Sequence, residues 1–127
     1  METETVDGST LESWTPEEVC RARDAREIVL IDVRSPQEFL FEHIEGALLM
    51  PLSGFDADAL PTQAGKRIVF HCGSGVRSEK VARGALAAGF EPVAHMAGGF
   101  AAWKAAGLPH MTTDMATGGP KKVPRQV

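Results

Sequence analysis

Two apolar runs that lead directly into helix-start signals constrain the fold of this chain more than any other feature. The run "EIVLIDV" (27–33) is rich in β-branched residues and is followed by Ser35, Pro36 and Glu38 at the N-cap, N1 and N3 positions of a helix. The run "KRIVF" (66–70) leads through a glycine-rich loop into the helical pattern "SEKVARGALAAGF". Strands that alternate with helices form a parallel sheet covered on both faces. The sequence therefore predicts an α/β fold.

The rest of the chain continues this alternation. Thr15, Pro16 and Glu18 in "TPEEVCRARDA" form another helix-start signal. Further strands are predicted in "ALLMPL" and "PVAHM", a helical turn in "FDADAL" and a last helix in "GFAAWKAAG". The helix after the glycine-rich loop is expected to open at Ser78 and to end at Gly89.

Polar segments at both ends predict the limits of the domain. The start, "METETVDGST", is acidic with little apolar pattern, and "HMTTDMATGGPKKVPRQV" is rich in Gly, Pro, Thr and basic residues. The chain has 127 residues, of which 43% are hydrophobic, which suits one compact core and is too little for two. We expect a flexible leader over 1–12, one domain over 13–109 and a flexible basic tail over 110–127.

The charge balance narrows the class of function. A net charge of -4 and a pI near 5.5 argue against a nucleic-acid or membrane-surface binder, because such proteins usually carry a basic face. The start lacks the pattern of a secretory signal, and no apolar stretch approaches the roughly 18 residues that span a bilayer. We expect a soluble cytoplasmic protein with no nucleic-acid or membrane partner.

Cysteine and histidine usage predicts no metal site, and we expect no organic cofactor either. Cys20 and Cys72 are too few for a disulfide framework, and their spacing matches no zinc motif. The histidines also lack ligand spacing; they are His43, His71, His95 and His110. Cys20 lies midway along an expected helix and is interpreted as a small buried residue.

Cys72 lies at the carboxyl end of an expected parallel strand, where α/β sheets place their reactive crevice. Gly73 and Gly75 allow the following backbone to curl, so that successive N–H groups can point at one centre. The helix that opens at Ser78 and the cation of Arg77 favour an anion there. Thiols in such surroundings have pKa values of about 3.5 to 7.5, which predicts a nucleophilic thiolate. A glycine-rich turn with a small buried cysteine is the purely structural interpretation.

Three segments together carry a family resemblance. The segments "LIDVRSPQEFLFEHIEGALLMPL", "FHCGSGVRS" and "HMAGGFAAWKAAGLP" follow one another in the order and spacing of the rhodanese homology domain. From about Trp14 to Pro109 the chain therefore resembles this sulfurtransferase family. The resemblance implies a rhodanese-like three-layer fold, with a mainly parallel five-stranded sheet and helices on both faces.

The resemblance also implies a mechanism in which Cys72 carries sulfur as a persulfide. A donor such as thiosulfate or a persulfide would supply the sulfur, and cyanide, a thiol or a sulfur-carrier protein would accept it. Arg77 would attract the anionic donor, Val76 would offer only its backbone, and Asp32 and Arg34 would brace the loop. The loop that would hold the transferred sulfur consists of Gly73, Ser74, Gly75, Val76, Arg77 and Ser78.

Two positions depart from the pattern of the family. Gly73 stands where many members have a polar or charged residue that helps to select the donor, so the donor remains open. Glu42 stands before His43 where a glycine is usual.

Two alternatives to sulfur transfer remain. The fold also hosts dual-specificity phosphatases, whose loop has five residues between the cysteine and the arginine, whereas only four separate Cys72 from Arg77. One residue fewer removes about 3.3–3.6 Å of reach, which favours a single sulfur atom over a phosphate. The second alternative is a non-catalytic module or a redox sensor, since an exposed thiol of low pKa oxidises readily.

Overall fold

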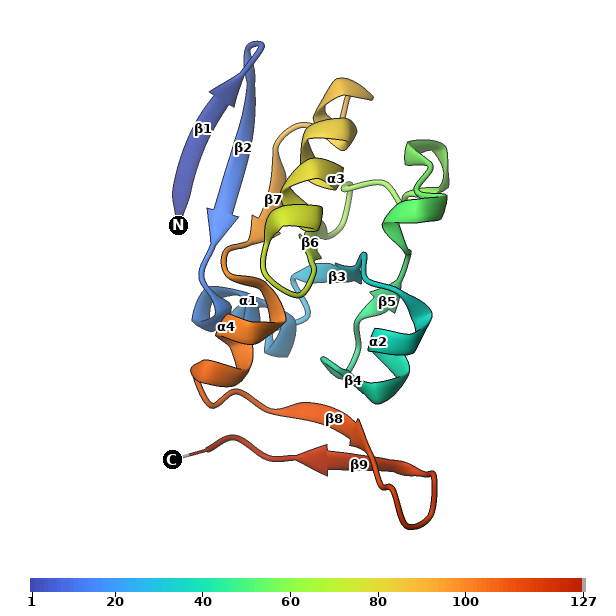
Figure 1. Ribbon diagram of the computed structural model, residues 1–127. Helices are drawn as coiled ribbons and strands as arrows, with labels where there is room; N and C mark the ends of the chain where they lie inside the picture. Colours follow the sequence, from blue (N-terminus) through green and yellow to red (C-terminus); the bar gives the residue numbers. More distant parts are fainter. Residues whose placement is uncertain (127) are drawn as a thin grey trace.

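A computed structural model describes residues 1–126 and has a six-stranded central sheet (Figure 1). In spatial order its strands are β1 (Glu2–Val6), β2 (Ser9–Trp14), β7 (Val93–Met96), β6 (Arg67–His71), β3 (Ile28–Asp32) and β5 (Leu48–Leu49). All neighbours are parallel except β1 and β2, which are antiparallel. The predicted α/β class and the mainly parallel sheet are thus confirmed. The sheet has six strands rather than the expected five, and β1 and most of β2 lie in the segment expected to be a flexible leader.

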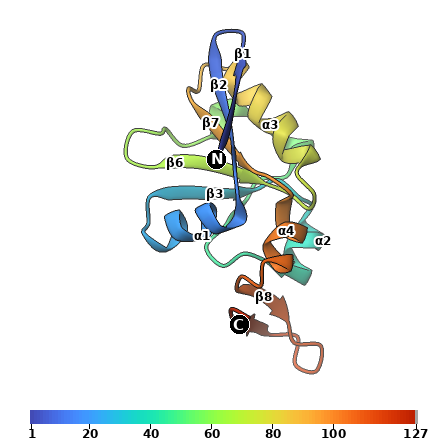
Figure 2. The ribbon, with the colours of Figure 1, turned by 90° about the vertical axis from the view of Figure 1, so that its left-hand side faces the viewer.

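The helices cover both faces of this sheet, as the three-layer prediction requires (Figure 2). They are α1 (Pro16–Asp24), α2 (Pro36–Phe41), α3 (Val76–Ala87) and α4 (Gly99–Ala105), with 3-10 turns at Leu52–Gly54 and Ala57–Ala59. One buried cluster lies on the face covered by α1 and α4, and the other lies beneath α3. Along β3, Ile28 and Leu30 belong to the first cluster and Ile31 to the second. Within residues 1–126, no helix is long and apolar enough to cross a membrane.

The predicted helix starts at Thr15 and Ser35 are confirmed as capping boxes. In each, the side chain of the cap accepts from the backbone N–H three residues later, and the glutamate there accepts from the N–H of the cap. Pro36 follows the cap in α2, as expected. These local bonds fix the direction in which α2 leaves the end of β3.

The expected flexible leader is instead a β-hairpin. β1 and β2 pair from Val6 with Ser9 outwards, and Asp7 and Gly8 both have positive φ (49° and 84°), as a two-residue hairpin turn requires. β2 then pairs in parallel with β7. An edge strand is open to solvent and needs few apolar residues, which is why the polar sequence of β1 gave no strand signal.

The expected flexible tail also forms strands. β8 (His110–Thr113) pairs with β9 (Pro120–Val123) and with β4 (Glu42–His43), which makes a second, antiparallel sheet at the lower end of Figure 1. β8 and β9 form a local hairpin of mostly polar residues, and β8 also pairs with the distant β4, so composition alone did not predict these strands. The N–H of Gln126 donates to the carbonyl of Gly107 at 2.7 Å. Val127, the last residue of the expected tail, lies outside the described residues.

Candidate active site

Cys72 follows β6 at the carboxyl edge of the parallel strands, as predicted. The next helix, α3, begins at Val76, two residues before the predicted start at Ser78. Gly75 is its N-cap and has a φ of 104°, a conformation that glycine adopts without strain. Ser78 therefore lies within the first turn of α3, where backbone N–H groups have no partner inside the helix.

Two of these loop N–H groups point at the Cys72 sulfur. The N–H of Gly75 lies 3.1 Å from Sγ and that of Ser78 lies 3.3 Å away. Cys72 is fully buried (0% exposed), and burial raises the pKa of its thiol. The N–H and hydroxyl of Ser78 and the N–H groups of Gly75 and Ser74 outweigh burial, so the pKa lies below that of an ordinary thiol. This loop therefore stabilises an anion on Cys72.

The first turn of α4 holds the carbonyl side of the same loop. The N–H of Phe100 donates to the Cys72 carbonyl at 2.7 Å, and that of Ala101 donates to the Gly73 carbonyl at 3.0 Å. This approach leaves no room at Gly99, where an added Cβ would lie 2.5 Å from the Cys72 oxygen. The carbonyls are thus bound from one side, and the N–H groups remain directed at the sulfur. The sequence analysis assigned no role to Gly99, because only the packing of α4 on the loop reveals it.

Arg77 does not contact the sulfur; it binds Glu38 of α2. The guanidinium donates to both carboxylate oxygens, at 2.7 and 3.0 Å. This bidentate bond is the largest reason why the pKa of Glu38 falls to about 2. The charge of the Cys72 thiolate is a smaller cause of the raised pKa of Arg77. Glu38 was predicted only as a capping residue, a role that it also has, and its spacing from Arg77 gave no separate signal.

Asp32 and Arg34 form a buried ion pair rather than a surface one. Their closest approach is 2.8 Å, with 0% and 5% of the side chains exposed. Arg34 also donates to the Glu42 carbonyl, and its guanidinium carbon lies 4.7 Å from the centre of the Phe100 ring. The Phe100 N–H binds the Cys72 carbonyl. The Asp32–Arg34 ion pair therefore contacts the loop indirectly, through Phe100.

The space beside the loop is an open groove of about 210 Å³. Its lining combines aromatic, apolar and charged groups from Arg34, Glu38, Phe41, Glu42, Gly73, Phe100, Ala101 and Lys104. Val76, also predicted for the loop, directs its side chain to solvent with 76% exposed. Cys20 is buried in α1, and burial raises the pKa of its thiol. Only Cys72 therefore combines a thiol with an anion-stabilising loop within residues 1–126.

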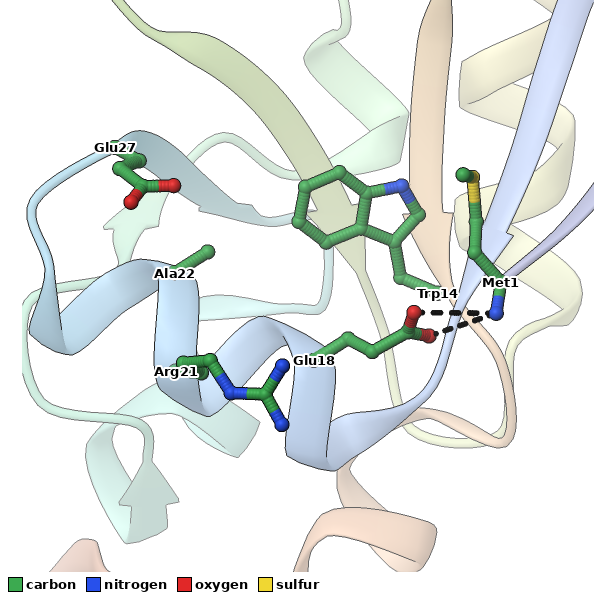
Figure 3. Close-up of a pocket in the computed structure, with 6 residues that line it drawn as sticks. All are labelled: Met1, Trp14, Glu18, Arg21, Ala22 and Glu27. Carbon is green, nitrogen blue, oxygen red and sulfur yellow. Dashed lines mark hydrogen bonds and ion pairs between the residues drawn. The ribbon is translucent and has the colours of Figure 1, made fainter.

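A second pocket, also about 210 Å³, lies between α1 and the N-terminus (Figure 3). Its lining residues are Met1, Trp14, Glu18, Arg21, Ala22 and Glu27. The N-terminal ammonium lies 3.1 Å from the Glu18 carboxylate. None of these lining residues is a nucleophile with a stabilised anion, so this pocket is not the candidate active site.

Comparison with known proteins identifies relatives of this site and fold. The chain is 39% identical over 112 residues to the uncharacterised protein slr1261 of Synechocystis; the match covers 88% of this chain and 61% of the relative. It thus spans less than two thirds of that protein. The chain is also 33% identical over 106 residues to the thiosulfate sulfurtransferase GlpE of Coxiella burnetii, which covers 84% of this chain and 91% of GlpE.

Similarity extends to solved structures and to a family model. RPA3614 of Rhodopseudomonas palustris, a protein of unknown function described as a possible tyrosine phosphatase, aligns with a TM-score of 0.67 and 30% identity. That alignment covers 76% of this chain and 82% of the other. The model of the rhodanese-like domain matches residues 15–106, which include the cysteine loop, both capped helices and the first turn of α4. The chain belongs to the rhodanese-like domain family.

Proposed function

We propose that this chain is a cytoplasmic sulfurtransferase that carries sulfane sulfur as a persulfide on Cys72, without a metal or other cofactor and without a nucleic-acid or membrane partner. The observation that carries the proposal is the environment of the buried sulfur. It accepts from the N–H groups of Gly75 and Ser78, inside a loop with only four residues between Cys72 and Arg77. Such a loop stabilises a charge of the size of one sulfur atom.

The reaction has two displacements at sulfur. The Cys72 thiolate attacks the outer sulfur of thiosulfate and forms a new S–S bond. The S–S bond of thiosulfate breaks, and its electron pair leaves with sulfite. An acceptor nucleophile then attacks the outer persulfide sulfur and takes it, and the electron pair of the broken S–S bond returns to Cys72 as thiolate. The loop N–H groups stabilise the negative charge in both steps.

The identities of donor and acceptor are part of the proposal. Thiosulfate is supported by the similarity to GlpE, a thiosulfate sulfurtransferase; another persulfide would present the same outer sulfur. Cyanide, a small thiol or a sulfur-carrier protein would serve as acceptor. An ideal Cβ at Gly73 would lie 3.1 Å from Nη2 of Arg77. The absence of a side chain at Gly73 therefore leaves the guanidinium at the edge of the loop, where an anionic donor would arrive.

A phosphatase of the same fold is the competing function, supported by the similarity to RPA3614. The loop of this chain is one residue shorter than the phosphatase loop, which crowds a tetrahedral phosphate. An alkoxide leaving group also needs a general acid. Glu79 is the acidic residue nearest to Cys72 in the sequence, and it lies 3.5 Å from Arg83 in an ion pair. Both observations favour sulfur over phosphorus.

Parallel assays of thiocyanate formation and of aryl phosphate hydrolysis test this proposal. We expect thiocyanate from thiosulfate and cyanide, no phosphate release, and loss of thiocyanate formation in Cys72→Ser. Cys20→Ser is the matched control and should retain the activity, because Cys20 lies in the other buried cluster. Phosphate release without thiocyanate formation would overturn the proposal.

Replacing Glu38 with glutamine should lower the KM for thiosulfate by about threefold. A change of this size corresponds to the free energy that a partly exposed ion pair contributes. Glutamine can keep the capping box of α2, but it removes the charge that occupies the Arg77 guanidinium. Steady-state kinetics at several ionic strengths would measure the change. A higher KM would mean that Glu38 holds Arg77 in place for the donor rather than competing with it.

A further inference from the structure

A buried chain of hydrogen bonds connects the Cys72 loop to β7 and β2. The Ser78 N–H lies 3.3 Å from the Cys72 sulfur, and the Ser78 hydroxyl lies 3.1 Å from Nδ1 of His95. Nε2 of His95 lies 3.2 Å from the hydroxyl of Ser13, which is partly exposed. Ser78 and His95 are both buried. His95 thus lies one side chain away from a thiol that has no direct contact with solvent.

The Ser78 hydroxyl has a single hydrogen and several neighbours that can accept it. One is the Gly75 carbonyl at 3.2 Å, and another is Nδ1 of His95 at 3.1 Å. The third is the Cys72 sulfur, to which Ser78 donates its N–H at 3.3 Å; a hydrogen bond from the Ser78 hydroxyl is among the causes that lower the pKa of this thiol. When His95 carries its hydrogen on Nε2, Nδ1 accepts the Ser78 hydrogen and draws it away from the sulfur. When the hydrogen is on Nδ1, the ring donates to Ser78 and leaves that hydrogen free for the sulfur.

We infer that His95 is a positioning residue for Cys72, which acts through Ser78 by directing the Ser78 hydroxyl hydrogen toward the sulfur. Ionisation of the thiol then proceeds along this chain. The Cys72 proton passes to the Ser78 oxygen, the Ser78 hydrogen passes to Nδ1 of His95, and the Nε2 hydrogen leaves through Ser13 to solvent. One proton is lost in total, and His95 changes tautomer. In the resulting state every hydrogen bond of the chain points at the thiolate, which strengthens the bond from Ser78.

The surroundings of His95 keep its ring neutral. Burial is the largest cause that lowers the pKa of His95. On α3, Glu79 raises the pKa of the His95 ring and Arg83 lowers it. Glu79 and Arg83 form an ion pair at 3.5 Å, and Arg83 also binds Glu4 of β1. On β6 the His95 ring lies in register with Phe70, which is uncharged.

The remaining charges of the neighbouring strands are directed away from this ring. Glu12 of β2 and Arg67 of β6 pair with each other at 2.8 Å, and side chains alternate between the faces of a strand. Ser13, one position after Glu12, is the β2 residue that faces His95. A neutral ring can either accept from the Ser78 hydroxyl at Nδ1 or donate to it there, and the positioning role rests on the donating arrangement.

The pH dependence of Cys72 alkylation by iodoacetamide tests this inference. His95→Leu should move the profile upward by half a pH unit or more, which is about a threefold slower reaction below the pKa. Ser78→Ala should move it at least as far. The double variant should move it no further than Ser78→Ala, because His95 acts through Ser78. Intact mass counts the labels, and Cys72→Ser gives the background from Cys20.

Two amide variants separate positioning from a merely structural role. Asparagine at position 95 places its amide near Nδ1, facing Ser78, whereas glutamine places its amide near Nε2, facing Ser13. We expect His95→Asn to retain the wild-type profile and His95→Gln to show the shifted one. If His95→Leu does not fold, the comparison of His95→Asn with His95→Gln still tests the inference. His110→Leu, at another buried histidine, which pairs with Glu42, is the matched control and should leave the profile unchanged.

A wild-type profile in His95→Leu or in His95→Gln, or additive shifts in the double variant, would overturn the inference. The role of this chain of hydrogen bonds in sulfur transfer rests on the proposed function. Alkylation reports the acidity of the thiol whichever substrate it meets. A shifted profile in a protein without sulfur transfer would therefore refute the proposed function and leave the role of His95 intact.

Discussion

Replacing Gly99 with alanine is expected to lower the free energy of unfolding by about 2–5 kcal/mol, from backbone strain and overpacking together. Gly99 has a φ of +61°, and an added Cβ would lie 2.5 Å from the Cys72 oxygen and 2.6 Å from the Gly73 carbonyl carbon. These are backbone atoms, which cannot rotate away. The loop or α4 must therefore move, and sulfur transfer should be lost together with stability. Urea unfolding and the thiocyanate assay measure the two effects.

Gly89→Ala is the matched control for Gly99→Ala. Gly89 also has a positive φ, +102°, but an added Cβ would meet nothing within 4 Å. Alanine should therefore cost about 1–2 kcal/mol from backbone strain alone and leave sulfur transfer intact. Equal losses of stability and activity in the two variants would contradict the close packing of α4 on the loop.

Replacing Asp32 with asparagine should lower the free energy of unfolding by about 3–5 kcal/mol, because Arg34 would keep a buried charge without its partner. The pair is almost fully enclosed, and Nε of Arg34 lies 3.0 and 3.1 Å from the two Asp32 oxygens. Asparagine fills nearly the same volume as aspartate. The loss of unfolding free energy therefore reports the missing charge rather than a cavity. Urea denaturation at neutral pH provides the value.

Glu38→Gln is the stability control for Asp32→Asn, since the Glu38–Arg77 pair has 38% of each side chain exposed. Solvent screening limits its contribution to about 1 kcal/mol or less. The low pKa of Glu38 means that this contribution is complete above about pH 4.5 and is lost as the pH falls toward about 2. If Asp32→Asn lowers the free energy of unfolding no more than Glu38→Gln does, the buried pair does not contribute the stability assigned to it.

Apolar runs and capping motifs predicted the centre of the fold, whereas the polar strands at its edges gave no apolar pattern. β3 and β6 are buried on both faces and read as apolar runs, and the capping boxes at Thr15 and Ser35 are short-range motifs. β1 and β9 are polar edge strands, each paired in an antiparallel hairpin with its neighbour in the sequence, so their composition indicated flexible ends. The Asp7–Gly8 pair was the one local hairpin signal that was overlooked.

At the active site, distance along the chain limited the prediction. The sequence predicted the Cys72 loop because strand, glycines and helix follow one another within a few residues. It did not predict the partners that lie far away along the chain, since Glu38 is 39 positions from Arg77 and His95 is 17 positions from Ser78. Only the folded sheet brings these groups together.

The most direct test of a persulfide on Cys72 is the intact mass of the protein after incubation with thiosulfate and removal of the excess. We predict that the wild-type chain and Cys20→Ser gain the mass of one sulfur atom and lose it when cyanide is added, while Cys72→Ser gains nothing. No added sulfur on the wild-type chain, or equal loading of Cys72→Ser, would contradict the proposed function.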